Sequence, residues 1–351
     1  RGEGKQAMKK QLNYIPFTKE MKKTYKILVP EMLPMHFKII AEYLKSEGYD
    51  VDVLSTHGKK IAETGLKYVH NDTCYPAILV IGQFIDALQS GRYDVHKTAL
   101  IYFQTGGGCR ASNYISLLRK ALKKAGFGFV PVISVSLNGL EKHSGFRITP
   151  SLAIKMFYCV FYGDLLLSLK NQVEPYEKNK GETKRIADEI TEELGKAVKR
   201  MRLSFKEVEK HCKKILGRFK QIPVDKTNKV RVGVVGEIYV KFSALGNNGL
   251  EELLLKEGAE PVVPGLMDFF IYTVYAKITD CKLFGLNRKM LPVFTFLYKF
   301  LLAKQRRFIG VIKSYEVFDA PTPFDEIVKL VDGYIDTGVK MGEGWLLTAE
   351  M

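Results

Sequence analysis

Residues 25–135 show a regular exchange between two kinds of hydrophobic pattern. Short apolar runs, typical of buried strands, alternate with stretches in which apolar residues recur every three or four positions, as on one face of a helix. We expect strands at YKILV (25–29), VDVL (51–54), KYVH (67–70), TALIYF (98–103) and FVPVISV (129–135). We expect helices at 37–44, 77–90 and 112–126. This order of strand, helix and strand predicts a parallel sheet with helices on both faces.

The pattern becomes mostly helical in the middle of the chain. Residues 151–169 are nearly all apolar, and the polar stretch 171–184 is expected to be a linker. Apolar residues spaced by three and four over 185–218 predict one or two long amphipathic helices. The strand pattern then returns at 229–240, and helices are expected at 248–258 and 292–308.

These patterns predict an α/β protein with two Rossmann-like lobes, each with a parallel sheet, joined by long helices. The expected divisions are an N-terminal segment (1–24), a first lobe (25–178), a helical connector (179–225) and a second lobe (226–351). The last residues have the pattern of a helix without a stop signal. We therefore expect the second lobe to continue beyond Met351.

The amino-acid composition and net charge indicate which classes of binding partner to expect. Of the 351 residues 46% are hydrophobic, which is enough for a buried core. The net charge of +16 fits either a lysine-rich solvated surface or a negatively charged partner. Basic and aromatic residues do not interleave as in a nucleic-acid module, and no apolar run reaches about 18 residues, so we expect neither a nucleic-acid nor a membrane partner. Five cysteines without a small-scaffold pattern predict a cytoplasmic protein.

Two cysteines occupy equivalent positions in successive βα units. Cys74 is expected between the strand at 67–70 and the next helix, and Cys109 between the strand at 98–103 and its helix. The carboxyl ends of parallel strands share one edge of the sheet, so both thiols should meet there. Helix N-termini stabilise thiolates, and thiolates held on shaped loops suit a soft metal centre such as an iron–sulfur cluster.

The loop around Cys109 reads QTGGGCRASNY. Backbone N–H groups of Gly106, Gly107 and Gly108 could face cluster sulfides or phosphate oxygens. The loop matches neither G-x-G-x-x-G nor a Walker A motif, so no NAD or NTP fingerprint is present. An alternative is that Cys109 is a catalytic nucleophile, and His70 could likewise assist the thiol of Cys74.

The other three cysteines are weaker candidates. Cys159 and Cys212 fall on apolar helical stripes and are expected in the core. Cys281 has polar neighbours, and we keep it as a candidate third metal ligand.

Four stretches resemble the large acyl-CoA dehydratase activase-related proteins, in the portion similar to 2-hydroxyacyl-CoA dehydratase subunits. They are HNDTCYPAILVIGQFIDALQSGRYD, QTGGGCRASNYISLLRKAL, GEIYVKFSALGNNGLE and GEGWLLTAEM. The resemblance covers most of the chain, from about residue 13 onward. It implies a two-lobed α/β fold that binds a [4Fe-4S] cluster or a related double-cubane cluster through cysteines. It also implies a separate ATP-hydrolysing activase that delivers a low-potential electron.

The resemblance assigns residues by their place in these motifs. Cys74 and Cys109 match the ligand cysteines, and remaining ligands are expected from Cys281 or from sequence beyond Met351. The other candidate cofactor-binding residues are Gly106, Gly107, Gly108, Arg110, Ser112 and Asn113 in the first lobe, and Glu237, Asn247 and Asn248 in the second. The last three are expected at the matching strand edge, and helix capping and turn formation are their alternative roles.

The leading hypothesis is an iron–sulfur redox protein of anaerobic metabolism that takes electrons from an ATP-dependent activase. If it is an enzyme, it is a lyase or reductase of the 2-hydroxyacyl-CoA dehydratase or double-cubane class, with an acyl-CoA or another small molecule as substrate. A homodimer or heterodimer is compatible with this hypothesis. The alternative is a non-catalytic or regulatory partner of an activase, without its own cluster. Fold analogy alone does not separate them.

Overall fold

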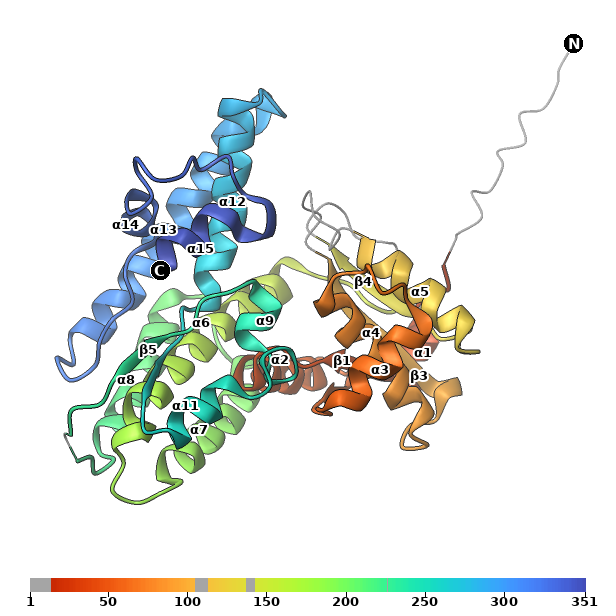
Figure 1. The fold of residues 1–351 in the computed structure, drawn as a ribbon, viewed down its shortest axis with the longest axis horizontal. Helices are drawn as coiled ribbons and strands as arrows, with labels where there is room; N and C mark the ends of the chain where they lie inside the picture. Colours follow the sequence, from red (N-terminus) through yellow and green to blue (C-terminus); the bar gives the residue numbers. More distant parts are fainter. Residues whose placement is uncertain (1–13, 105–112, 137–142, 226) are drawn as a thin grey trace, which may run out of the picture.

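A four-stranded parallel sheet forms the centre of the first half of the chain. The computed structural model describes residues 14–104, 113–136, 143–225 and 227–351. The strands are β1 (Lys26–Pro30), β2 (Asp50–Leu54), β3 (Thr98–Gln104) and β4 (Val132–Ser136), in the spatial order β2-β1-β3-β4. All three pairings are parallel, with Lys26 opposite both Asp50 and Thr98. The predicted α/β class and parallel sheet are thereby confirmed (Figure 1).

Alternate side chains of the strands enter two different cores, because successive residues of a strand point to opposite faces. Ile27 and Val29 pack in one core with α2 (Pro34–Ser46) and α6 (Pro150–Val173). Leu28 and Leu100 pack in the other with α4 (Tyr75–Gln89) and α5 (Tyr114–Lys124). Helices therefore cover both faces of the sheet. A short helix, α1 (Lys19–Thr24), precedes β1, and the 3₁₀ turn η1 (Val95–Lys97) precedes β3.

The prediction of a strand at 67–70 is wrong. Helix α3 (Lys59–Tyr68) continues through the first two of these residues, and α3 and α4 together make the crossover from β2 to β3. The two helices approach closely through Gly65 and Gly82. A Cβ atom at Gly65 would lie 2.1 Å from the carbonyl oxygen of Ile78, and one at Gly82 would lie 2.1 Å from that of Ile61. The glycine pair thus lets the α3 backbone pack directly on α4. The pattern of the four residues 67–70 did not indicate this helix–helix contact.

Long helices fill the middle of the chain. Helix α6 lies largely in the core, as its apolar sequence predicted. The expectation that no apolar run is long enough to span a membrane is wrong by length and composition, because Pro150–Tyr176 is one such stretch among the described residues. However, 72% of its most apolar window is buried inside the protein. The linker expected at 171–184 is mostly helical instead. Its residues include the end of α6, the turn η3 (Glu174–Tyr176) and the start of α7 (Glu182–Val198). Two amphipathic helices, α7 and α8 (Phe205–Lys220), confirm the prediction for 185–218.

The second half of the chain has a small sheet and many helices. Two parallel strands, β5 (Arg231–Gly233) and β6 (Glu260–Val262), are paired there. The strand expected over 229–240 is only three residues long, because the chain turns into a helix after residue 237. The helices are α9 (Ile238–Phe242), α10 (Ala244–Asn247), α11 (Leu250–Lys256), α12 (Leu266–Leu283), α13 (Leu291–Lys313), α14 (Phe324–Lys329) and α15 (Gly344–Glu350), with turns η4 (Arg288–Met290) and η5 (Met341–Glu343).

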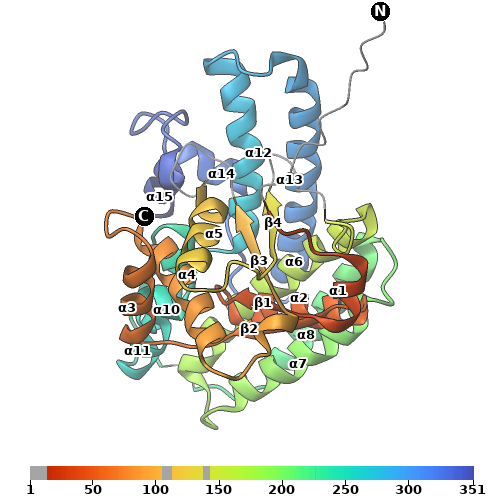
Figure 2. The ribbon, with the colours of Figure 1, turned by 90° about the vertical axis from the view of Figure 1, so that its right-hand side faces the viewer.

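One helical hairpin extends away from the rest of the molecule. It consists of α12 and α13, which lie side by side and are joined by η4 (Figures 1 and 2). At its base, α13 packs against α8, and the lower part of α12 packs against α6. The far end of the hairpin lies apart from both sheets.

A buried carboxylate connects three helices from different parts of the chain. Asp164 in α6 accepts a hydrogen bond from the backbone N–H of Leu266 (2.7 Å) and from that of Met267 (2.9 Å), both at the start of α12. Its Oδ1 atom also lies 2.8 Å from Nε2 of His36 in α2. The imidazole is fully buried and the carboxylate nearly so. This contact fixes the base of the hairpin against the first sheet.

Candidate functional site

The carboxyl edge of the first sheet gathers the predicted site. The strand order places β1 beside β3, and the chain leaves these two strands toward opposite faces of the sheet, through α2 after β1 and α5 after β3. Such a switch point is where open parallel sheets bind ligands. Helix α4 runs back toward β3 and α5 runs away from it, so both helices have their N-termini at this edge. The segment 105–112 connects β3 to α5.

Cys74 sits at the N-terminus of α4, as its N-cap residue. Its thiol is half-buried and unpaired with any described cysteine. The Sγ atom lies 2.7 Å from the hydroxyl oxygen of Tyr114, the first residue of α5. The expectation that Cys74 follows a strand is wrong, because α3 precedes its loop. The thiol nevertheless reaches the predicted edge, because it is carried by the helix N-terminus and not by a strand end.

Tyr114, which contacts this thiol, belongs to a group of neighbouring tyrosines. Tyr114 stacks on Tyr102 of β3, with ring centroids 5.6 Å apart and planes at 21°. Burial raises the pKa of Tyr102 well above its ordinary value, and the neighbouring Tyr114, Tyr239, Cys74 and Glu237 raise it further. Residues from both halves of the chain therefore act on the Tyr102 ring.

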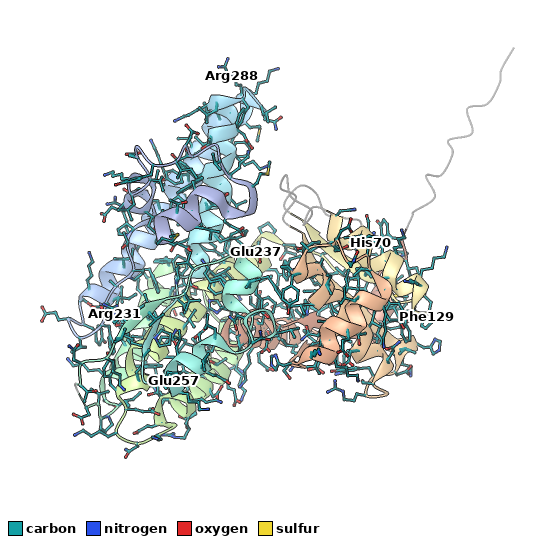
Figure 3. The ribbon with its side chains drawn as sticks, viewed as in Figure 1. His70, Phe129, Arg231, Glu237, Glu257 and Arg288 are labelled. Carbon is teal, nitrogen blue, oxygen red and sulfur yellow. The ribbon has the colours of Figure 1, made fainter. Side chains whose placement is uncertain are left out.

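The second half of the chain reaches the site through α9. Tyr239 belongs to the same hydrophobic core as side chains of α4 and α5. Glu237 caps α9 by accepting the backbone N–H groups of Tyr239 (3.0 Å) and Val240 (3.2 Å). Burial raises the pKa of Glu237, although these two hydrogen bonds oppose the shift. Figure 3 shows Glu237 where the two halves of the molecule meet.

Further acidic groups lie behind Glu237. Burial raises the pKa of Glu343 to about 7, and the negative charge of Glu237 adds to this effect. Lys241 and Glu350 form an ion pair at 2.9 Å, with side chains only 6% and 4% exposed. These carboxyls come from α9, η5 and α15, which are distant in sequence and adjacent in the fold. One of them, Glu343, holds its proton near neutral pH.

Glu31 extends the acidic character to the end of β1. Burial raises its pKa, and the nearby His57 partly offsets the effect. The His57 Nε2 atom lies 3.8 Å from Oε2 of Glu31. His70 was a candidate to assist the thiol, yet its Nδ1 atom pairs with Asp72 at 2.6 Å on the exposed side of the loop (Figure 3).

Several predicted site residues lie outside the part of the chain that the structure describes. They are Gly106, Gly107, Gly108, Cys109, Arg110 and Ser112. Asn113, the first described residue after them, is exposed and precedes α5. Its role in cofactor binding stays a prediction.

The predicted residues of the second half have capping contacts. Asn247 donates to the carbonyl of Lys241 (3.2 Å) and accepts from the N–H of Leu250 (3.1 Å). Asn248 ends α10 in the left-handed region, with φ 57°. These are the contacts expected of helix capping and turn formation. Their proposed contact with a cofactor stays a prediction.

The remaining cysteines are separate from Cys74. Cys159 and Cys212 are buried in the core as expected. Cys281 lies near the far end of α12 and its thiol donates to the carbonyl of Asn287 at 3.6 Å. Among the described residues no group of three or more His, Cys, Asp and Glu side chains could hold a metal ion. Thus the described part of the site offers one cysteine ligand, Cys74, and Cys281 is not brought to it.

Comparisons of the chain with models of protein families, with curated proteins and with solved structures found no match. The family therefore stays a prediction that rests on the four sequence stretches.

Sequence reasoning missed the tyrosines of the site and its acidic groups other than Glu237. Tyr114 was counted with the apolar face of its helix, and its position beside the GGGCR loop was the available signal. Tyr102 ends an apolar strand, and Tyr239 follows Glu237 in a quoted motif. The clustering of Glu343 and Glu350 with Lys241 depends on contacts over about a hundred residues, which a single sequence does not show.

Proposed function

We propose that this chain is an iron–sulfur redox protein of the 2-hydroxyacyl-CoA dehydratase class, in which Cys74 and Cys109 ligate one cluster. The observation that carries the proposal is the 2.7 Å contact between Cys74 Sγ and Tyr114 Oη. It supports a thiol held at the carboxyl edge of a parallel sheet, beside the helix that the GGGCR loop enters. Two Rossmann-like lobes are part of the same proposal, with the two-stranded parallel sheet as the centre of the second.

The donor set fits the proposal in part. Cys74 is half-buried at the N-terminus of α4, and its thiol forms no disulfide with a described cysteine. Cys109 supplies the second thiolate in the proposal, and it is five positions from each end of the segment between Gln104 and Tyr114. Further ligands have to come from outside the described residues. A bound cluster would supply low-potential electron transfer, and an ATP-dependent activase would be its electron donor.

The surrounding side chains have roles that suit this chemistry. With Cys74 as thiolate, Tyr114 is the hydrogen-bond donor, which stabilises negative charge on the sulfur. Tyr102 stacks on the Tyr114 ring and so helps to hold that hydroxyl beside the thiol. Glu343 holds a proton up to about neutral pH in the adjacent acidic group. A substrate reduced at this edge would therefore find a proton source close by.

The test is anaerobic reconstitution followed by iron and sulfide analysis and visible and EPR spectra. We expect the wild type to bind iron and sulfide, and Cys74→Ala and Cys109→Ala each to lose most of both. Cys212→Ala is the control, because this thiol is buried in the core of α8 and should leave the iron content unchanged. A wild type without iron would overturn the proposal and favour the non-catalytic partner of an activase. Iron retained in both site variants would also overturn it.

Tyr114→Phe tests the hydrogen bond itself. The variant keeps the ring that stacks on Tyr102 and removes only the hydroxyl that contacts Cys74. Because hydrogen bonds to cluster sulfurs help set the reduction potential, we expect full iron content with a more negative potential. Redox titration followed by EPR measures this difference. An unchanged potential would show that the hydroxyl does not donate to a ligand sulfur.

A further inference from the structure

The far end of the α12–α13 hairpin exposes a group of large apolar side chains. We name it the hairpin tip surface. Its residues are Leu283, Phe284, Leu286, Met290, Val293 and Phe296, each 43–72% exposed. Several large apolar side chains exposed at one end of a helical hairpin are a feature of interaction sites.

Helix α13 has two apolar faces with different surroundings. Leu301, Phe308 and Ile312 face the protein and are buried. Val293, Phe296 and Phe300 follow one another at spacings of three and four and are exposed. A run with this spacing lies on one face of a helix. In the described part of the chain this face of α13 is not covered.

The charge of this region is mostly positive, although Asp280 of α12 pairs with Lys340, and Asp336 accepts from the N–H of Gly338, which lies next to Leu283 and Phe284. Residues 281–315 contain eight Lys and Arg residues and no Asp or Glu. Arg306 and Arg307, near the base, pair with Asp325 and Glu209. Among the ion pairs of the described residues, none involves Lys282, Arg288, Lys289 or Lys299, which are four cations in the outer part of the hairpin.

The combination of exposed apolar side chains and positive charge favours one kind of partner. A symmetric contact between two copies would bring these four cations against the same four, so like charges would oppose the apolar contact. A bilayer with anionic headgroups can interact with both the apolar side chains and the cations. Apolar side chains enter the headgroup and acyl boundary, while Lys and Arg remain at the negatively charged surface. The hairpin also projects with Arg288 at its far end, free of the two sheets (Figures 2 and 3).

We propose that the hairpin tip surface docks this protein on an anionic lipid surface. The contact is peripheral and requires no membrane-spanning helix. It corrects the expectation of no membrane partner, which considered membrane-spanning segments only. This inference is independent of the iron–sulfur proposal.

The test is co-sedimentation of the purified protein with vesicles of phosphatidylcholine alone or mixed with phosphatidylglycerol. We expect at least tenfold tighter binding to the anionic vesicles, weakened by raising the salt concentration. The charge-reversal variant Arg288→Glu with Lys289→Glu should lose at least tenfold. The variant Phe284→Ser with Phe296→Ser should lose a similar factor, because it removes the apolar contact and keeps every charge.

Leu253→Ser is the matched control, since Leu253 is exposed on α11 and lies outside the hairpin. It should bind like the wild type, and circular dichroism checks that each variant is folded. No binding to anionic vesicles at low salt would overturn the proposal. Binding that survives the phenylalanine changes would also overturn it, because the net charge alone would then explain the affinity. A dimer that Phe296→Ser dissociates, without vesicle binding, would assign the surface to a second copy.

Discussion

Asp268 offers the sharpest test of the buried acidic network. It lies in α12 with a side chain almost completely buried, and Nε2 of Gln305 donates to its Oδ1 at 2.6 Å. Burial raises its pKa to about 8, and the negative charge of Asp164 adds to the effect. Lys241 and Glu350 act on it in opposite directions. We predict that Asp268→Asn stabilises the protein at alkaline pH.

The sign and size follow from proton linkage. The carboxyl titrates at about 8 when folded and near 3.8 when unfolded, so the folded state binds the proton more tightly. Stability from this group is complete below pH 3.8 and is lost as the pH rises toward 8. At about 1.4 kcal/mol for each pKa unit, the full loss is about 5–6 kcal/mol. About 4 kcal/mol of it falls between pH 5 and pH 8. Asparagine is neutral at every pH, and its side-chain oxygen still accepts the hydrogen bond from Gln305. The variant therefore does not lose this stability as the pH rises.

The assay is urea denaturation of wild type and variant at pH 5 and pH 8. The advantage of Asp268→Asn should grow by several kcal/mol between the two pH values. Asp332→Asn is the control, because this carboxyl is exposed and its removal should change stability little at either pH. Equal stability of Asp268→Asn and wild type at both pH values would refute the reasoning. It would mean that the folded protein tolerates an ionised carboxylate at this position.

Two further changes test the packing around the site. Gly82→Ala should destabilise by about 3 kcal/mol or more in urea denaturation, because the new Cβ meets the α3 backbone. Gly310→Ala, in a helix with open space at the Cβ position, should instead stabilise by about 0.5–1 kcal/mol, and an equal effect of both changes would contradict the close α3–α4 contact. Glu350→Ala should cost about 3–5 kcal/mol because it leaves the Lys241 ammonium buried without its partner. Combining it with Lys241→Met should recover much of that loss, and no recovery would show that the charge is not the cause.

The sequence predicted the first sheet well where strands are short, apolar and separated by helices. The strands at 25–29, 51–54 and 98–103 appear within one or two residues of their expected positions. The segment 67–70 failed because four residues of mixed pattern do not distinguish a strand from the end of a helix. The contact of α3 with α4 at two glycines stabilises the helix at this position. That contact depends on the approach of two backbones, which hydrophobic periodicity does not report.

The site was predictable in position more than in composition. The expected reason for placing Cys74 at the carboxyl edge was a preceding strand, and it was wrong; the N-terminus of α4 places the thiol there instead. The role of Tyr114 depended on its hydroxyl reaching a loop forty residues away in sequence. The raised pKa values of Asp268 and Glu343 depend on burial by the folded protein, so the residues next to them in the sequence do not predict these shifts.

The central claim is that Cys74 and Cys109 hold one iron–sulfur centre together. Thiol alkylation of the anaerobically reconstituted protein, followed by mass spectrometry, measures this most directly. We predict that both thiols are protected while iron is bound and that both become reactive after chelation. Cys159 and Cys212, which are buried in the core, serve as unreactive internal references. Alkylation of either Cys74 or Cys109 in the iron-loaded protein, with the other protected, would contradict the shared centre.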